Sequence, residues 1–430
     1  MTKRGFWDDP QWMIAVALFV FAALTYVPFL SLPPLPDDYL VAEKAERYGW
    51  PAGWGALMQD TLYRCRATSL VVTAILLQWF GFSEAAFNMA STLGHGINVL
   101  LLYLLGTVRW IGWRISAIAA FFFAVRERHH EAVVWMSALP EILVLMFVLL
   151  AVYACYRWLT DGHWYWLAAA SVAFVLALFS KESGVVLAAI LPAIHWVERR
   201  DWRAAIWPAL GFGLVAALYF GASLIGSAAN HHFSDGTFAL QLGFLRVLVA
   251  SLARNLWIWG GLSLAVLLWT GFQERRTLLA FAGFWLVVGL VPYSFLTYMP
   301  RIPSRHHYLA SVGTSILTAV AFWMMYGLAK HRQVWALVVP LVFVAQQWSY
   351  LWIVKRQQFD HRAKPIEMLL DVVRVNPERE IHFRCGEFLN EEARRAIRYR
   401  IGEGIEPKVS VDPVAPAGAI EIPCGGHGPL

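Results

Sequence analysis

The sequence predicts an all-α polytopic membrane protein with about eleven transmembrane helices, followed by a small carboxyl-terminal α/β domain outside the cytoplasm. Of the 430 residues, 59% are hydrophobic and 15% are charged, and the mean hydropathy is +0.52. A soluble domain cannot bury that much apolar surface, so the composition is typical of a chain that crosses a membrane many times. The composition turns polar from about Lys355, which predicts a membrane domain over residues 1–354 and a soluble domain over residues 355–430.

A membrane-spanning helix needs about 20 apolar residues, and eleven stretches meet or approach this length. They lie near residues 11–30, 85–106, 112–126, 132–156, 164–180, 184–197, 204–222, 246–270, 277–297, 307–329 and 333–354. The first stretch is too long for a signal-peptide core and no small-residue cleavage site follows it, so we interpret it as a helix. Residues 67–82 are apolar but short, and fit better as a helix on the membrane surface within a first outer loop, residues 31–84.

The basic residues indicate which loops face the cytoplasm. The formal net charge is +6, and arginines recur in short loops near residues 109–114, 199–203, 275–276 and 330–332. By the positive-inside rule these loops are cytoplasmic, which places the amino terminus inside and the carboxyl-terminal domain outside. The same distribution argues against nucleic-acid binding, which needs basic residues gathered on one face.

The carboxyl-terminal segment contains the remaining local signals. Residues 381–383 resemble a strand, and residues 390–399 are predicted to be helical. Four cysteines are too few for a disulfide scaffold. A bridge between Cys385 and Cys424 remains open, because both belong to a segment predicted to lie in an oxidising compartment.

Two adjacent carboxylates, Asp37 and Asp38, follow the first apolar stretch. A second like charge nearby resists ionisation, so a carboxylate pair at a membrane exit is costly and indicates an active site at the membrane surface. Prolines at positions 33, 34 and 36 stiffen the approach to Asp37. The alternative is that the pair caps a helix that starts near Tyr39, because aspartate is a favoured N-cap residue.

A polar stripe runs along the predicted helix over residues 85–106. Its members Asn88, Ser91, His95 and Asn98 recur at a spacing that puts them on one helix face. That face must meet protein or water instead of lipid. Hydrogen bonding between helices explains the stripe as well as a functional role does.

The segment that begins at Arg126 is rich in titratable residues. On the predicted helix over residues 132–156 and the residue before it, Glu131 and Glu141 share a face about 15 Å apart. A divalent metal could be held by His129, His130 and Glu131, but adjacent helical residues diverge and no clear third partner is evident. No cofactor is therefore firmly predicted.

Two further loops carry charge on the predicted outer side. Lys181 and Glu182 interrupt a long apolar stretch, and the alternative to a functional role is a hairpin turn with a local ion pair. A second loop is strongly basic, and its members are Arg301, Arg305, His306 and His307. Such cations suit an anionic headgroup, either of a substrate or of surrounding lipids bound nonspecifically.

Six motifs occur in order over residues 30–315. They are Asp37-Asp38-Tyr39, Tyr63-Arg64, Phe87-Asn88 with His95 and Asn98, His129-x-Glu131-Ala132-Val133-x-Trp135, Ser180-Lys181-Glu182-Ser183 and Arg305-x-x-Tyr308-Leu309-x-Ser311-Val312-Gly313. Together they resemble the membrane-embedded C-type (GT-C) glycosyltransferases, in the protein O-mannosyltransferase branch that includes the tetratricopeptide-bearing transmembrane mannosyltransferases.

The chain departs from this family at several positions. The family often has His-Pro where this chain has Arg126-Glu127, proline where it has Cys65, and arginine where it has Leu139. No tetratricopeptide array follows the membrane domain, because the predicted soluble domain has only about 75 residues. These departures bear on the acceptor more than on the chemistry.

The resemblance implies an inverting hexosyl or pentosyl transfer from a polyprenyl-phosphate sugar to an acceptor hydroxyl. The reaction would take place on the non-cytoplasmic face of a membrane such as the bacterial inner membrane, among membrane lipids, with a protein, lipid or glycan as acceptor. A phosphate leaving group needs cations and a single base instead of a strong acid. Two alternatives stay open, a transporter or flippase of a lipid-linked sugar and a non-catalytic assembly subunit.

The resemblance also implies roles for individual residues. Asp37 is expected to deprotonate the acceptor, with Asp38 positioning it or balancing charge. The residues expected to bind the donor phosphate are Arg64, Lys181, Arg305, His306 and His307. The residues expected to orient donor or acceptor are His95, Asn98, His129, Glu131, Glu182 and Tyr308.

Overall fold

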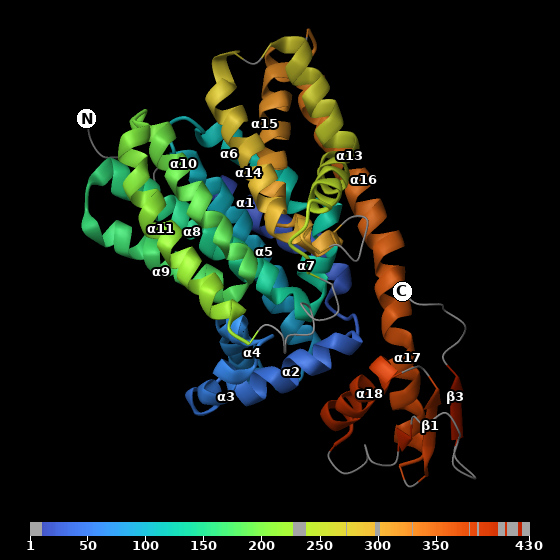
Figure 1. Ribbon diagram of the computed structural model, residues 1–430. Coiled ribbons are helices and arrows are strands. Elements are labelled where there is room, and N and C mark those ends of the chain that lie inside the picture. Colours follow the sequence, from blue (N-terminus) through green and yellow to red (C-terminus); the bar gives the residue numbers. More distant parts are fainter. Residues whose placement is uncertain are drawn as a thin grey trace.

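Each predicted apolar stretch contains a helix in the computed structural model, which describes residues 11–226, 238–271, 273–296, 302–328, 330–377, 379–384, 387–402, 409–410 and 420–423 (Figure 1). The helices of the bundle are α1 (Gln11–Tyr26), α5 (Glu84–Leu104), α6 (Trp113–Ala124), α8 (Leu139–Asp161), α9 (Trp164–Ser180), α10 (Leu187–Arg199), α11 (Trp202–Leu224), α13 (Phe244–Thr270), α14 (Arg276–Ser294), α15 (Ser311–Leu328) and α16 (Arg332–Ser349).

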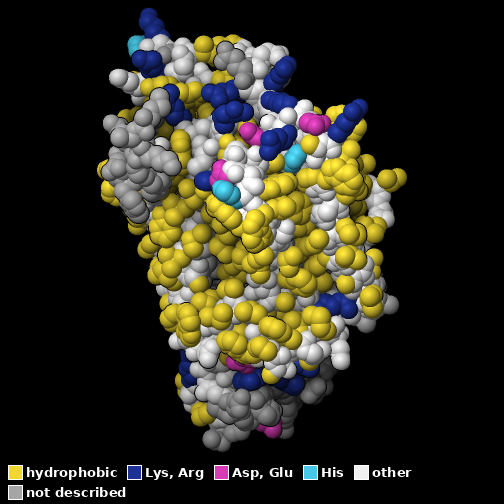
Figure 2. Space-filling model, turned by 90° about the vertical axis from the view of Figure 1, so that its left-hand side faces the viewer, with side chains coloured by type: hydrophobic (Ala, Val, Ile, Leu, Met, Phe, Trp, Pro, Cys, Tyr) yellow, Lys and Arg dark blue, Asp and Glu magenta, His cyan; other side chains and the backbone are white. Residues whose placement is uncertain are grey.

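The bundle is that of an integral membrane protein, which confirms the predicted fold class. Among the described residues, eight helical segments are long and apolar enough to cross a membrane, and α6 and α9 are shorter apolar helices. Figure 2 shows a broad apolar band between two ends that carry the charged side chains. Such a band matches the hydrocarbon core of a bilayer. The number of crossings, eleven, stays a prediction.

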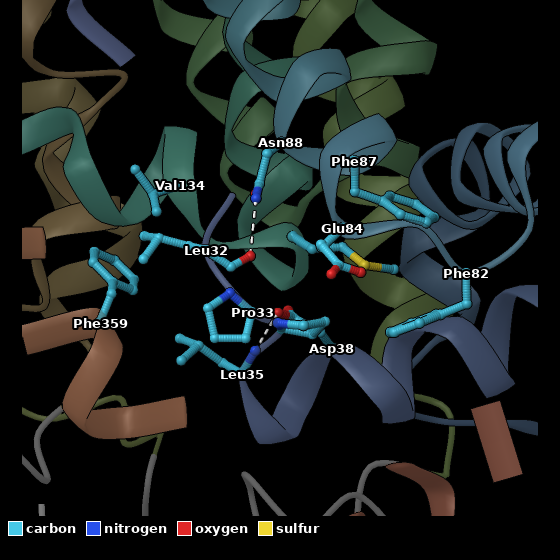
Figure 3. Close-up of a pocket in the computed structure, with 12 residues that line it drawn as sticks. Leu32, Pro33, Leu35, Asp38, Phe82, Glu84, Phe87, Asn88, Val134 and Phe359 are labelled. Atoms are coloured by element: carbon cyan, nitrogen blue, oxygen red, sulfur yellow. Dashed lines mark hydrogen bonds between the residues drawn. The ribbon is translucent and has the colours of Figure 1, made fainter. Parts of the chain in front are cut away.

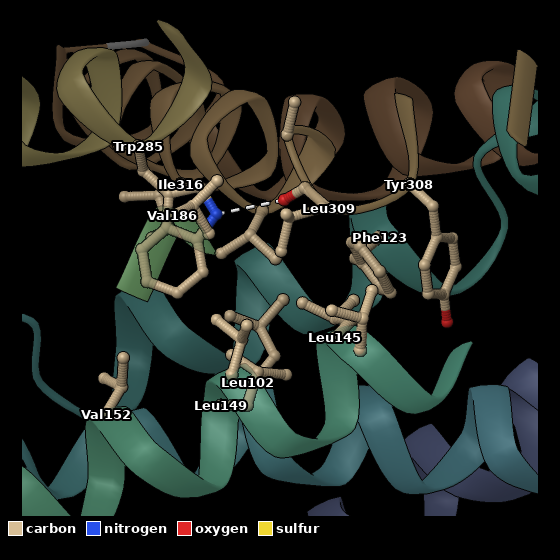
Figure 4. Packing of buried hydrophobic residues seen from close by; sticks show 14 of the residues in the cluster. Leu102, Phe123, Leu145, Leu149, Val152, Val186, Trp285, Tyr308, Leu309 and Ile316 are labelled. Carbon is tan, nitrogen blue, oxygen red and sulfur yellow. Dashed lines mark hydrogen bonds between the residues drawn. The ribbon is translucent and has the colours of Figure 1, made fainter. Parts of the chain in front are cut away.

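The centre of the bundle is formed around α8. In an apolar window of 18 residues within Met136–Asp161, 72% of the residues are buried, whereas the share is 22% in the corresponding window of Trp202–Leu224 at the periphery. The core continues into α14 and α15, where Trp285 donates its indole N–H to the Leu309 carbonyl at 3.0 Å (Figure 4). At Gly313 a Cβ atom would collide with the α14 backbone, so this small residue permits the close approach of α14 and α15.

Short helices lie at one end of the bundle (Figure 1). They are α2 (Pro36–Tyr48), α3 (Trp54–Gln59) and α4 (Ala67–Phe80), all within the predicted first outer loop. The helix α4 occupies the segment that the sequence places on the membrane surface, and α2 packs against it. Its position relative to a membrane stays a prediction.

The helix predicted over residues 132–156 is broken. It consists of α7 (His130–Val134), an extended residue Trp135 and a 3₁₀ turn Met136–Ala138, after which α8 begins. The physical reason is Pro140, which lacks a backbone N–H and is favoured in the first turn of a helix, so the chain restarts there. Glu131 and Glu141 therefore lie on separate elements, and the prediction of one shared face is wrong.

The helix predicted to end near residue 354 continues without interruption. A π-helical turn, Tyr350–Lys355, leads from α16 into α17 (Arg356–Val375). Composition becomes polar here, but backbone hydrogen bonding persists because apolar residues recur at helical spacing and are buried, among them Phe359, Ala363, Ile366 and Leu370.

Beyond α17 lie a small parallel sheet and one helix. The described strands β1 (Ile381–Arg384), β2 (Val409–Ser410) and β3 (Ile420–Pro423) have the order β2-β1-β3, and α18 (Glu387–Arg400) follows β1. The strand and the helix predicted near residues 381 and 390 are thus confirmed. Tyr39 of α2 is fully buried in the same apolar cluster as α17, β1 and α18, so this segment is docked on the first outer loop. Cys385 and Cys424 lie outside the described residues, and their disulfide stays a prediction.

Candidate active site

Asp38 is buried and closes the amino-terminal end of α2. Its carboxylate accepts the Leu35 N–H at 2.8 Å (Figure 3), and it also accepts the Ser137 N–H at 2.8 Å and the Ser137 hydroxyl at 2.7 Å. Burial raises the pKa of Asp38 to about 7, although the Ser137 hydrogen bonds oppose this rise. Capping, the alternative to catalysis, therefore describes the contacts of Asp38.

The pocket beside Asp38 is small. Its walls come from the 33–35 segment, α5 and Phe359 of α17, and Asn88 holds that segment by donating to the Leu32 carbonyl at 3.3 Å (Figure 3). The cavity measures about 10 Å³, which is room for about one water molecule. A sugar does not fit there.

Asp37 differs from its neighbour because it is only half-buried. Among the described residues, none forms a hydrogen bond or ion pair with its carboxylate. Burial raises the pKa of Asp37, while the positive charges of Arg305 and Arg362 act in the opposite direction. A reachable carboxylate of raised basicity suits a proton acceptor.

Asp37 belongs to what we call the outer cluster, whose other members are Glu131, Trp135, Arg305 and Arg362. The positive charges of the two arginines act on both carboxylates, and both guanidiniums lie over the Trp135 ring. Glu131 accepts the backbone N–H of Arg305 at 3.0 Å, and its carboxylate lies 3.9 Å from the Arg305 guanidinium. The guanidiniums of Arg305 and Arg362 lie 4.6 and 4.5 Å from the centroid of the Trp135 ring. Sequence reasoning missed Arg362, because nothing distinguishes it from the other arginines of a polar segment.

A second group, the inner cluster, consists of Glu141, Lys181, His306 and Tyr293. Lys181 forms an ion pair with Glu141, His306 Nδ1 lies 2.6 Å from the same carboxylate, and the Tyr293 hydroxyl donates to it at 2.6 Å. Burial lowers the pKa of His306 to about 3, with the charge of Lys181 acting in the same direction. The imidazole is therefore neutral at pH 7. Two residues expected to bind phosphate are thus engaged by a buried carboxylate.

Lys181 and Glu182 form ion pairs with other residues and not with each other, so the alternative of a local ion pair does not apply. Glu182 instead lies 3.4 Å from the guanidinium of Arg66, another residue that sequence reasoning missed. Arg64 donates to the Ser223 carbonyl at 2.8 Å, at the end of α11. No contact among the described residues joins Arg64 to the other expected phosphate ligands, and Arg301 lies outside the described residues.

The polar stripe connects helices in the interior. His95 Nδ1 lies 2.8 Å from the Tyr308 hydroxyl and Nε2 lies 2.9 Å from the Ala124 carbonyl. Asn98 donates to the Ile142 carbonyl at 3.0 Å and to the Tyr308 hydroxyl at 3.2 Å. Because all three of these side chains have no exposed surface, they hold helices together in this structure instead of facing a ligand.

Two more expected site residues are interior. His129 Nε2 lies 2.8 Å from the Ser311 hydroxyl, and His307 Nδ1 lies 3.2 Å from the Asn255 amide. Nδ1 of His130 lies 2.6 Å from the Glu127 carbonyl oxygen. The adjacent residues His129 and His130 therefore have different partners. Among the described residues, no three histidine, cysteine or acidic side chains are grouped as metal ligands.

Comparisons with known proteins agree with this architecture. Residues 69–225 match the family model of dolichyl-phosphate-mannose-protein mannosyltransferases. ArnT from Cupriavidus metallidurans, solved bound to undecaprenyl phosphate, is 15% identical with a TM-score of 0.57, over 92% of this chain and 87% of that one. The archaeal oligosaccharyltransferase AglB from Archaeoglobus fulgidus, solved with an inhibitory peptide and a dolichol-phosphate, is 12% identical with a TM-score of 0.54, over 91% and 64%.

A search of curated protein sequences gave no match. At these identities the solved structures establish the fold, and the family model adds a sequence signature that runs from α4 through α11. Both agree with the resemblance of the ordered motifs. The chain therefore shares the fold of ArnT and AglB, and over residues 69–225 it is similar to the dolichyl-phosphate-mannose-protein mannosyltransferases.

Proposed function

We propose that the protein transfers a sugar from a polyprenyl-phosphate donor to an acceptor hydroxyl on the non-cytoplasmic face of the membrane. The two similar structures contain undecaprenyl phosphate or a dolichol-phosphate, and the matching family model is named for a dolichyl-phosphate sugar. These names support a lipid-linked donor. The acceptor is a protein, lipid or glycan that carries a free hydroxyl.

The observation that carries the proposal is the outer cluster, where a half-buried carboxylate lies beside two guanidiniums. Asp37 accepts the proton of the acceptor hydroxyl, whose oxygen forms a bond to the anomeric carbon. The bond from that carbon to the phosphate oxygen breaks, and its electron pair stays on the lipid phosphate. Arg305 stabilises this negative charge, so no strong general acid is required. Asp38 supports the step by fixing the start of α2.

The sidedness follows from charge and from the position of the outer cluster. The arginine-rich loops are assigned to the cytoplasm, as is the amino terminus. The helices α2, α17 and α18 and the small sheet lie together at one end of the bundle (Figure 1). We assign this end to the non-cytoplasmic side, where a bacterial inner-membrane enzyme would meet its acceptor.

The test is transfer by purified Asp37→Asn protein supplied with a polyprenyl-phosphate sugar. Asparagine keeps the size of the side chain but cannot accept the proton, so we expect normal folding and a loss of turnover of about 100-fold or more. The matched control is Asp371→Asn, because Asp371 is an exposed aspartate on α17 paired with Arg374. Near-normal turnover by Asp37→Asn would overturn the catalytic assignment.

The same variant separates the two alternative functions. A flippase moves the lipid-linked sugar across the membrane of a vesicle and needs no catalytic base for this, so Asp37→Asn would keep that activity. An assembly subunit would release no polyprenyl phosphate from the donor in any variant. Release of polyprenyl phosphate that depends on Asp37 is the outcome expected of the glycosyltransferase.

A further inference from the structure

We propose that Arg362 of α17 completes an anion site with Arg305 and that this site binds the phosphate of the lipid-linked donor. The carboxyl-terminal segment then takes part directly in donor recognition. This inference rests on the proposed function, because it names a residue of the same site. No motif and no comparison singles out this arginine.

The first argument is the shared aromatic ring. The two guanidiniums are 4.6 and 4.5 Å from the centroid of Trp135, so they are no further apart than the sum of those distances, about 9 Å. Two positive groups at that separation repel each other and are best held together by an anion that contacts both. A phosphate group offers several oxygens to two guanidiniums in charge-assisted hydrogen bonds.

The second argument is that neither guanidinium forms a close ion pair, although the charges of Asp37 and Glu131 act on both arginines. Arg305 is 25% exposed and its guanidinium is only at the limit of ion-pair distance from Glu131, 3.9 Å away. For Arg362, which is half-buried, no carboxylate among the described residues lies within ion-pair distance. The indole N–H of Trp135 is buried and has no hydrogen-bond partner in the described part of the chain, which leaves one more donor in the same side chain.

The third argument is that α17 and α18 pack together on the first outer loop. The α18 helix docks on the first outer loop through three ion pairs, in which α18 supplies the arginine and the loop supplies the glutamate. They are Arg395 with Glu43, Arg398 with Glu46 at 3.5 Å and Arg400 with Glu84 at 2.6 Å. Tyr39, two residues after Asp37, is fully buried in the apolar cluster of the carboxyl-terminal segment. The position of Arg362 beside Asp37 therefore follows from an extensive contact.

Binding of polyprenyl monophosphate to full-length protein in detergent tests the proposal without requiring transfer. We expect Arg362→Gln to raise the Kd by about 10- to 100-fold, the usual range for the loss of a hydrogen bond to a charged group. Arg362→Lys keeps the charge but loses the planar guanidinium, so its Kd should lie between those of the wild-type protein and Arg362→Gln. The matched control is Arg374→Gln, because Arg374 is exposed on the same helix and pairs with Asp371.

Two further probes identify what the site recognises. Polyprenol, which lacks the phosphate, should bind wild-type protein and Arg362→Gln equally weakly. Inorganic phosphate should displace polyprenyl monophosphate from wild-type protein more effectively than from Arg362→Gln. Unchanged binding of polyprenyl monophosphate by Arg362→Gln, or equal binding of polyprenol and polyprenyl monophosphate, would overturn the proposal. Since binding is measured apart from turnover, a failure here is distinct from a failure of Asp37→Asn to lose transfer.

Discussion

Replacement of Lys181 by methionine would leave Glu141 as a carboxylate inside the bundle without its cation. The Glu141 side chain is 1% exposed and that of Lys181 is 13% exposed. The substitution removes the Lys181 charge, which lowers the pKa of His306, but burial, the largest cause of the lowering, remains. The remaining partners of Glu141 are then the Tyr293 hydroxyl and the His306 ring.

The expected loss of stability is about 3–5 kcal/mol, the usual cost of removing one member of a buried ion pair. The corresponding shift in melting temperature follows from the unfolding entropy. At about 2.1 cal/mol/K per residue, the 430 residues give about 0.9 kcal/mol/K. Lys181→Met should therefore lower the melting temperature by about 3–6 °C.

The structure supplies its own assay for this unfolding. Cys65 and Cys155 are buried free thiols, so they react with a fluorogenic maleimide only when the bundle opens. The double variant Lys181→Met/Glu141→Gln leaves no charge at either of these two positions and should recover part of the lost stability. An unchanged melting temperature for Lys181→Met, or a double variant as unstable as the sum of the two single variants, would refute the reasoning. Lys181 would then be available for the donor phosphate.

Two other predictions follow from the outer end and from the loops. Burial raises the pKa of Glu392 to about 7, with Asp37 adding to the rise. Because the folded pKa exceeds the unfolded one, the contribution of Glu392 to the docking of α18 is complete below the ordinary carboxylate range and is lost as pH rises to about 7. Hydrogen exchange of α18 whose change between about pH 5 and 7 is unaffected by Glu392→Gln would contradict this. Reporter fusions after Lys330 and after Lys355 should report opposite compartments, and like signals from both would disprove the topology.

The fold could be predicted from the sequence because apolar runs of about 20 residues specify membrane helices locally. The errors occurred where composition and backbone geometry disagree. At Trp135 an apolar run contains a break because Pro140 starts a new helix, and after Lys355 a polar run contains no break because its buried residues keep helical spacing.

The candidate site was predicted in part. Asp37, Glu131 and Arg305 are brought together, since each lies where a helix leaves the bundle at the same end. Partners could not be predicted, because an ion pair between distant elements leaves no local pattern. Lys181 forms an ion pair with Glu141, and Glu182 forms one with Arg66. In an isolated loop, Lys181 and Glu182 would be expected to pair with each other.

The unbroken helix from Arg332 to Val375 connects the bundle with the outer cluster. Its 44 residues extend about 66 Å at 1.5 Å per residue, about twice the thickness of a hydrocarbon core. Arg362 lies about 45 Å along it, so a change of tilt of about 5° moves that guanidinium by about 4 Å, more than the length of a hydrogen bond. Because Phe343 packs in the core of the bundle and Ile366 packs in the apolar cluster around Tyr39, contacts at both ends of this helix hold its tilt and with it the spacing of the two arginines.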